Sequence, residues 1–129
     1  YGEIRWKPYY TDINKNHLLD FHEALSIPLT PSHLTQDSGV AFAFAEFTYE
    51  NKEEIILQIE TSNSFTLWFN NNKILENLTS LPQVQIFEAK VSLRKWKNSI
   101  FIKMIKDNGE HSFILNFYDN KRKKIDINW

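Results

Sequence analysis

An alternation of apolar and polar residues with a period of two constrains this fold most strongly. The segments 54–60 and 64–70 each place three large apolar residues on one face. Because the side chains of a strand point alternately to opposite faces, this spacing indicates β-strands with one buried face. In the segment 40–45 both faces are apolar, one with phenylalanines and the other with alanines, which predicts a central strand covered on both sides.

Further apolar segments continue this pattern to the end of the sequence, separated by short polar turns; they are 84–93, 100–104, 113–117 and 125–129. Between 65 and 75 we expect a hairpin that turns at 70–72, because asparagine tolerates the left-handed backbone well. The spacing predicts an all-β protein, a jelly-roll-like antiparallel β-sandwich of about eight or nine strands. The exception is one short helical turn near residues 17–25, where leucines recur at helical spacing.

Chain length and charge narrow the classes of partner. A chain of 129 residues is expected to form a single domain, 1–129. A net charge of -1 gives no general attraction for nucleic acid, and no apolar run reaches the roughly 18 residues of a membrane span. The absence of cysteine excludes disulfides and thiol chemistry. Because the sequence begins with neither methionine nor a signal pattern, we expect it to be excised from a longer protein.

Three segments carry a resemblance to a known family. The segment 60–73, ETSNSFTLWFNNNK, resembles the G-S-D-D-G-x-x-x-W-x-N-G-K hairpin of bacterial galactose-binding-like and PA14-like β-sandwich modules. LRKWKNSIFIKM at 93–104 is similar to their L-K-x-G-x-N-x-L-x-V-K-V segment, and 112–117 to their closing strand. The resemblance implies a non-catalytic module of the kind appended to glycoside hydrolases and other secreted enzymes. It also implies an extracellular, cell-surface or periplasmic location.

The sequence departs from the family pattern in the hairpin and in the segment after it. Ser62 and Asn63 replace the acidic pair, Ser64 replaces a glycine, and the glycine before Asn98 is missing. In related modules the carboxylate loop helps to hold a ligand or a calcium ion. The fold is therefore expected to carry over better than the ligand site.

Sugar-binding modules stack exposed aromatic rings on pyranose rings and bind hydroxyls with nearby amides. Trp68 lies off the main apolar face of its segment, Trp96 lies in a turn, and polar residues flank the hairpin. The candidate ligand-binding residues are thus Asn63, Trp68, Asn70, Asn71, Lys73 and Trp96. The alternative for Trp68 is that it packs under a neighbouring loop or against a partner domain.

The segment 12–23 fits the spacing of a calcium-binding loop, with oxygen-bearing side chains at the appropriate positions; the candidate metal ligands are Asp12, Asn14, Asn16, Asp20 and Glu23. Its sixth position holds His17 where such loops need glycine, so a plain polar loop is the alternative. Apart from Ca²⁺ at this loop, the sequence predicts no cofactor.

No motif for catalysis appears among the four histidines or the serines, and we expect the protein not to be an enzyme. The basic run 121–124 is interpreted as a solvated surface. The sequence therefore predicts a carbohydrate-binding or accessory module of a larger secreted protein. The alternative is a structural or protein-interaction domain that packs on a neighbouring catalytic domain and binds no sugar.

Overall fold

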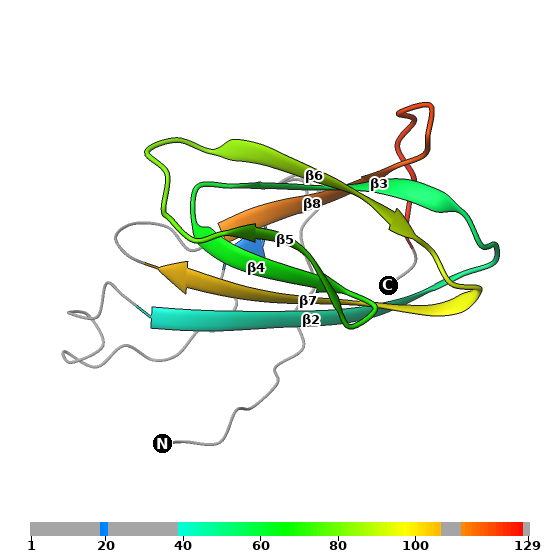
Figure 1. Ribbon diagram of the computed structural model, residues 1–129, viewed down its shortest axis with the longest axis horizontal. Helices are drawn as coiled ribbons and strands as arrows, with labels where there is room; N and C mark the ends of the chain where they lie inside the picture. The colour runs from blue at the N-terminus through cyan, green and yellow to red at the C-terminus, as the bar shows by residue number, and fades with distance from the viewer. Residues whose placement is uncertain (1–18, 21–38, 107–111, 128–129) are drawn as a thin grey trace, which may run out of the picture.

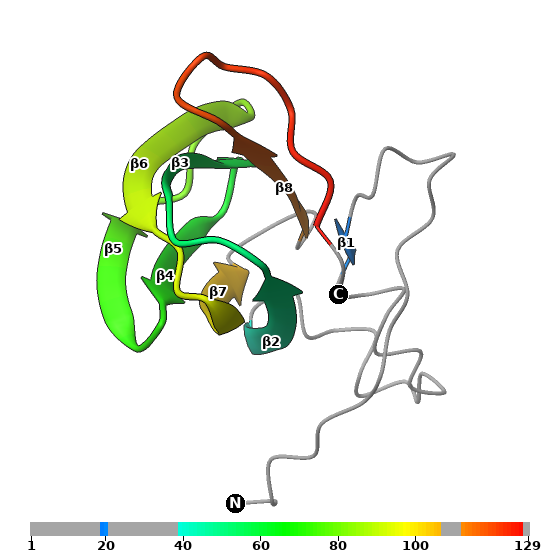
Figure 2. The same ribbon diagram turned by 90° about the vertical axis from the view of Figure 1, so that its right-hand side faces the viewer.

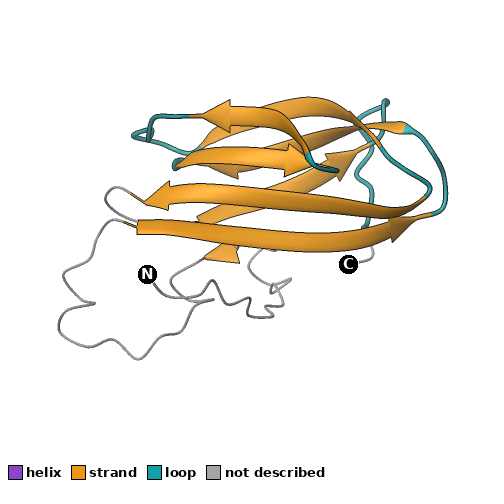
Figure 3. Cartoon of the chain, turned by 60° about the horizontal axis from the view of Figure 1, so that its bottom comes forward, coloured by secondary structure: helices purple, strands orange, loops and turns teal. Residues whose placement is uncertain are grey.

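The chain forms two antiparallel β-sheets packed face to face (Figure 1, Figure 3), as seen in a computed structural model that describes residues 19–20, 39–106 and 112–127. The strands, in chain order, are β1 (Leu19–Asp20), β2 (Gly39–Tyr49), β3 (Glu54–Thr61), β4 (Ser64–Phe69), β5 (Asn72–Asn77), β6 (Gln85–Ser92), β7 (Trp96–Lys106) and β8 (Ser112–Tyr118). The predicted all-β sandwich is confirmed.

The order of the strands is that of a jelly roll. One sheet, the β3 sheet, has the order β1-β8-β3-β6, and the other, the β7 sheet, has the order β2-β7-β4-β5. The first strand pairs with the eighth, the second with the seventh, the third with the sixth and the fourth with the fifth. A long hairpin folded over on itself gives this pairing, and Figure 2 shows the two resulting layers end-on.

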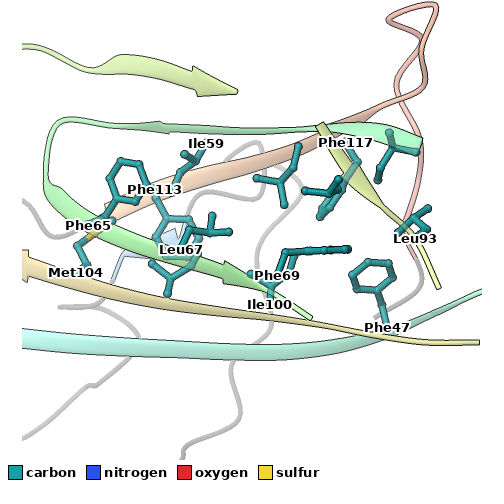
Figure 4. Packing of buried hydrophobic residues seen from close by; sticks show 14 of the residues in the cluster. Phe47, Ile59, Phe65, Leu67, Phe69, Leu93, Ile100, Met104, Phe113 and Phe117 are labelled. Carbon is teal, nitrogen blue, oxygen red and sulfur yellow. The ribbon is translucent and has the colours of Figure 1, made fainter. Parts of the chain in front are cut away.

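The core lies between the sheets and is built from the alternating residues that the sequence places on one face. Figure 4 shows Phe65, Leu67 and Phe69 of β4 pointing into the space between the sheets. Leu57 and Ile59 of β3 face them from the opposite sheet and are completely buried. The packing of branched aliphatic and aromatic side chains supplies the main apolar burial that holds the sandwich together.

The β4–β5 hairpin turns through two residues. Phe69 pairs with Asn72 across the turn, and the two residues between them, Asn70 and Asn71, have φ angles of 47° and 69°. Positive φ at both central residues identifies a type I′ turn, whose twist matches that of the flanking strands. The predicted hairpin and its left-handed asparagines are confirmed.

The prediction that residues 40–45 form a central strand is wrong. Within the part of the chain that the structure describes, β2 lies at the edge of the β7 sheet. Its alanine face points to the core, where Ala41 is buried, but on the other face Val40 and Phe44 are 52% and 49% exposed. A strand with two apolar faces is not necessarily covered on both, because an apolar outer face gives the same sequence pattern.

Two other predictions fail near the chain ends. Residues 125–127 form no strand; Lys124 makes one isolated bridge to Tyr118, and Ile125 and Ile127 pack on the core without a ladder. In the expected helical turn at 17–25, Leu19–Asp20 is instead the short strand β1, because its backbone pairs with β8. The other residues of that turn, and residues 128–129, lie outside the described residues.

Candidate functional site

Three connections meet at one end of the sandwich, which we call the turn end: residues 50–53, 70–71 and 93–95. Antiparallel pairing brings them together, since β2, β4 and β6 finish at this end and β3, β5 and β7 begin there. It lies at the right of Figure 1. Two backbone hydrogen bonds tie the connections, from Asn70 N to Ser99 O (2.9 Å) and from Leu93 N to Glu53 O (2.8 Å).

Asn70 and Asn98 connect the segments of the turn end through side-chain hydrogen bonds. Asn70 Nδ2 donates to Asn98 Oδ1 at 3.0 Å, and Asn70 Oδ1 accepts from Ser99 N at 2.8 Å. Asn98 Oδ1 also accepts from Arg94 N, while Asn98 Nδ2 donates to Arg94 O. Both asparagines are buried, so the structure assigns Asn70, a predicted ligand residue, a place inside the fold.

Asn63 lies at the opposite end of β4 from Asn70 and is buried as well. Its Oδ1 accepts from Ser112 N at 3.2 Å, and its backbone N donates to Thr61 Oγ1 at 3.1 Å. Thr61 Oγ1 in turn donates to Ser112 O at 2.8 Å. The structure therefore separates Asn63 from Asn70 and Asn71 by the length of the six-residue strand β4, about 20 Å.

Trp68 and Lys73 do come together, on the outer face of the β7 sheet. They are cross-strand partners beside a bulge that leaves Ile74 unpaired between the strands.

Aromatic rings pack on one another on this outer face. The ring of Trp68 contacts the ring of Phe101 edge-on, with 5.4 Å between the ring centres. The centres of the Phe101 and Phe42 rings lie 5.7 Å apart. With their neighbours on the edge strand, these side chains form an outer patch of Val40, Phe42, Phe44, Trp68 and Phe101. Lys73 pairs with Glu76 at 3.6 Å, and the nearby Asn71 is exposed at the hairpin tip.

Trp96 is displayed at the turn end in an unusual conformation. The sequence predicts Trp96 in a turn, but it is the first residue of the strand β7. Its φ is 80°, a region that bulky residues rarely occupy, and its side chain is 60% exposed. Glycine is the residue to which this backbone conformation is least costly. Lys95 Nζ lies 5.5 Å from the centre of the indole.

Beside this loop an open crevice of about 390 Å³ lies between the edge strands β5 and β6. Its floor is apolar and its rim is polar and basic; the lining residues are Lys52, Phe69, Asn70, Asn72, Ile74, Lys90, Val91, Ser92, Leu93 and Arg94. The three cations are functional candidates that sequence reasoning missed. They are scattered along the sequence, and only the pairing of the strands brings them to one place.

Two polar contacts shift the pKa values of surface groups. Tyr49 OH donates to Glu53 Oε1 at 2.7 Å, and this hydrogen bond, with burial and the nearby negative charges, raises the pKa of Tyr49 to about 12. On the β3 sheet, Arg122 donates two hydrogen bonds to Glu88, at 3.0 and 3.1 Å, which lower the pKa of the Glu88 carboxyl. Both contacts fasten loops to strands.

Of the predicted calcium ligands, only Asp20 is described, in β1, where its backbone pairs with Ser112. Asp12, Asn14, Asn16 and Glu23 lie outside the described residues. Within the described ranges, no three histidine, aspartate or glutamate side chains gather in a way that could hold a metal ion. The calcium site stays a prediction.

No protein-family model matches the chain, and no curated protein matches it either. No helix among the described residues is long and apolar enough to cross a membrane.

Proposed function

We propose that this chain is a non-catalytic carbohydrate-binding module of a larger secreted protein, and that Trp96 stacks on the sugar. The observation that carries the proposal is the cost of Trp96 to the fold. A bulky residue at positive φ destabilises the native state by about 1–3 kcal/mol. An indole that is 60% exposed regains little of that by burial. A residue that weakens the fold in both respects is expected where binding requires it.

The surroundings of Trp96 suit a sugar. An exposed indole offers an apolar face to the C–H groups of a pyranose, and polar groups nearby satisfy its hydroxyls. Lys95 and Lys97 flank the ring in sequence, and the polar rim of the crevice begins at Arg94, two residues before it. The proposal also draws on the resemblance of the segments 60–73 and 93–104 to galactose-binding-like and PA14-like modules.

Replacing Trp96 by glycine separates binding from stability. Trp96→Gly removes the stacking ring and relieves the backbone, so we expect glycan affinity to fall at least tenfold, roughly 1.4 kcal/mol or more. We expect the melting temperature to rise by about 3–6 °C, because about 1 kcal/mol of strain is released. A glycan array followed by calorimetry on the best ligand measures the first effect, and thermal unfolding the second.

Trp68→Ala is the matched control. It removes the other described tryptophan that was predicted to bind sugar, on the outer patch away from the turn end, and should leave glycan affinity within twofold. Unchanged affinity in Trp96→Gly, or the absence of any glycan ligand for the unaltered protein, contradicts the proposal. Loss of affinity in Trp68→Ala alone would move the site to the outer patch.

The outer patch supports a second candidate, a packing domain that docks on a protein neighbour. Val40 and Phe44 remain 52% and 49% exposed beside half-buried aromatic rings. Exposed apolar side chains that lie together in one patch indicate a surface that contacts a partner. Hydrogen exchange of the edge strand β2 and of its neighbour β7, compared between this chain and the product of its full open reading frame, tests the idea. Docking predicts slower exchange in the longer protein.

A further inference from the structure

The crevice at the turn end is lined by buried apolar residues and by cationic residues from three segments. Lys52 comes from the β2–β3 connection, Lys90 from β6, and Arg94 from the β6–β7 connection. Val91 and Leu93 on the floor are buried members of the core. The crevice is thus supported from below by the rigid part of the molecule.

The cations differ in how far neighbouring carboxylates already neutralise them. Lys90 Nζ lies 4.0 Å from Glu54 Oε1, at the limit of an ion pair. Lys52 and Arg94 form no ion pair with a carboxylate of the described residues. Among the described residues of the crevice, Lys52 and Arg94 are thus the cations that no carboxylate neutralises.

Arg94 is held at its backbone while its side chain is exposed. Asn98 binds both the N–H and the C=O of Arg94, at 2.8 and 3.0 Å, and Asn98 is itself buried. A guanidinium on a fixed backbone loses less conformational freedom on binding than one on a loose loop. It also presents a planar pair of N–H donors that matches a carboxylate or a sulfate.

We infer that the crevice binds the anionic group, a carboxylate or a sulfate, of an acidic polysaccharide. This inference rests on the proposed function and names its substrate class. Arg94 and Lys52 bind the anion, while Asn72 and Ser92 supply polar groups for the neighbouring hydroxyls. Arg94 and Trp96 are two residues apart, at most about 7 Å along an extended chain, so one glycan chain can engage both.

Charge complementarity is local, since the chain as a whole has a net charge of -1 and a pI of about 6.5. A general attraction to polyanions is therefore not expected, and binding should depend on particular cations. This permits a control with the same change in net charge. Lys121 and Lys123 are exposed on the connection that follows β8 and do not line the crevice.

The test compares four proteins against three polymers in affinity electrophoresis. The proteins are the unaltered chain, Lys52→Gln/Arg94→Gln, Lys121→Gln/Lys123→Gln and Trp96→Gly. The polymers are polygalacturonate, which carries carboxylates, dextran sulfate, which carries sulfates, and neutral dextran. We expect the unaltered chain to bind at least one polyanion and Lys52→Gln/Arg94→Gln to bind it at least tenfold more weakly. The Lys121→Gln/Lys123→Gln control should stay within twofold of the unaltered chain.

The polymers identify the source of the anion, and the salt dependence provides a measurement that needs no variant. Binding to the preferred polyanion should weaken as ionic strength rises, because exposed ion pairs are screened. An equal loss in both double variants, or no polyanion binding by the unaltered chain, overturns the inference. If neutral glycans bind through Trp96 and polyanions do not bind, the proposed function stands and this inference fails. If polyanions bind equally well in Trp96→Gly, stacking at Trp96 fails while the anion site stands.

Discussion

Three buried asparagines join the connections of this sandwich to its strands: Asn63, Asn70 and Asn98. Each side-chain amide forms hydrogen bonds at a point where the backbone no longer pairs with a neighbouring strand. Peptide groups at the turns therefore keep hydrogen-bond partners. Among the described residues, every buried side-chain nitrogen or oxygen has such a partner. Leaving one unpaired would cost about 1–3 kcal/mol. These amides therefore stabilise the scaffold on which Trp96 and the crevice are mounted.

The Tyr49–Glu53 hydrogen bond contributes to the stability of the folded protein, and this contribution is lost at alkaline pH. It is the main cause that raises the pKa of Tyr49 to about 12 from an ordinary value of 10.0, so the folded protein holds the phenolic proton more tightly than the unfolded chain. The contribution is complete below pH 10 and is lost as the pH rises from 10 to about 12. The stability advantage over Tyr49→Phe should shrink across that range.

Tyrosinate absorbance measures the same group directly. Glu53→Gln removes the carboxylate acceptor and its charge, so the titration of Tyr49 should move back toward 10.0. A titration that is identical in Glu53→Gln and the unaltered protein would show that the hydrogen bond does not set the pKa. Tyr49→Phe serves as the blank, because it removes this phenol from the titration.

At the residue scale, only part of the candidate site could be predicted from the sequence. Asparagine composition identifies turns but cannot tell an amide that faces a ligand from one that binds the backbone, and Asn63 and Asn70 are of the second kind. The φ of 80° at Trp96 could not be predicted from its residue type, because bulky residues rarely occupy this region. Lys52 and Arg94 become neighbours only through long-range pairing.

At the scale of elements, the β4–β5 hairpin is the best specified part of the chain. Its strands have clear alternation, and the residues of its turn favour the left-handed backbone that a type I′ turn requires. The two asparagines of the turn have different structural roles. Asn70 is buried and bound to Asn98, whereas Asn71 is exposed and serves the turn through its backbone alone.

Substitutions at Asn71 should therefore report backbone preference without loss of packing. Its φ of 69° disfavours alanine, so Asn71→Ala is expected to destabilise the protein by about 1 kcal/mol. Asn71→Gly should stay within about 0.5 kcal/mol of the unaltered protein, because glycine accepts this conformation readily. Urea unfolding measures both values. Equal stability of the two variants would contradict a strained left-handed position.

For the whole molecule, the pairing of early strands with late ones makes the two sheets depend on each other. Alternation at 54–60, 64–70 and 113–117 was sufficient to predict the strands and the sandwich class. It could not place β2 at an edge, because the neighbours of a strand are chosen by the folding of the entire chain. Nor could it show that Ile125 and Ile127 pack without a ladder, since burial alone produces the same spacing.

Two leucines offer a matched test of how the sheets are held together. Leu57 lies in β3, and its side chain is 0% exposed in the core between the two sheets. Leu78 follows β5 and is 72% exposed. Leu57→Ala removes contacts that both layers share and is expected to cost about 2–5 kcal/mol, while Leu78→Ala should change stability by less than about 0.5 kcal/mol. Urea unfolding followed by tryptophan fluorescence and by far-ultraviolet circular dichroism measures both.

The same two signals test whether the sheets unfold together. Because each sheet buries its inner face only against the other, the two signals should shift together in Leu57→Ala. Separate transitions would mean that one sheet persists without its partner, which the shared core does not allow.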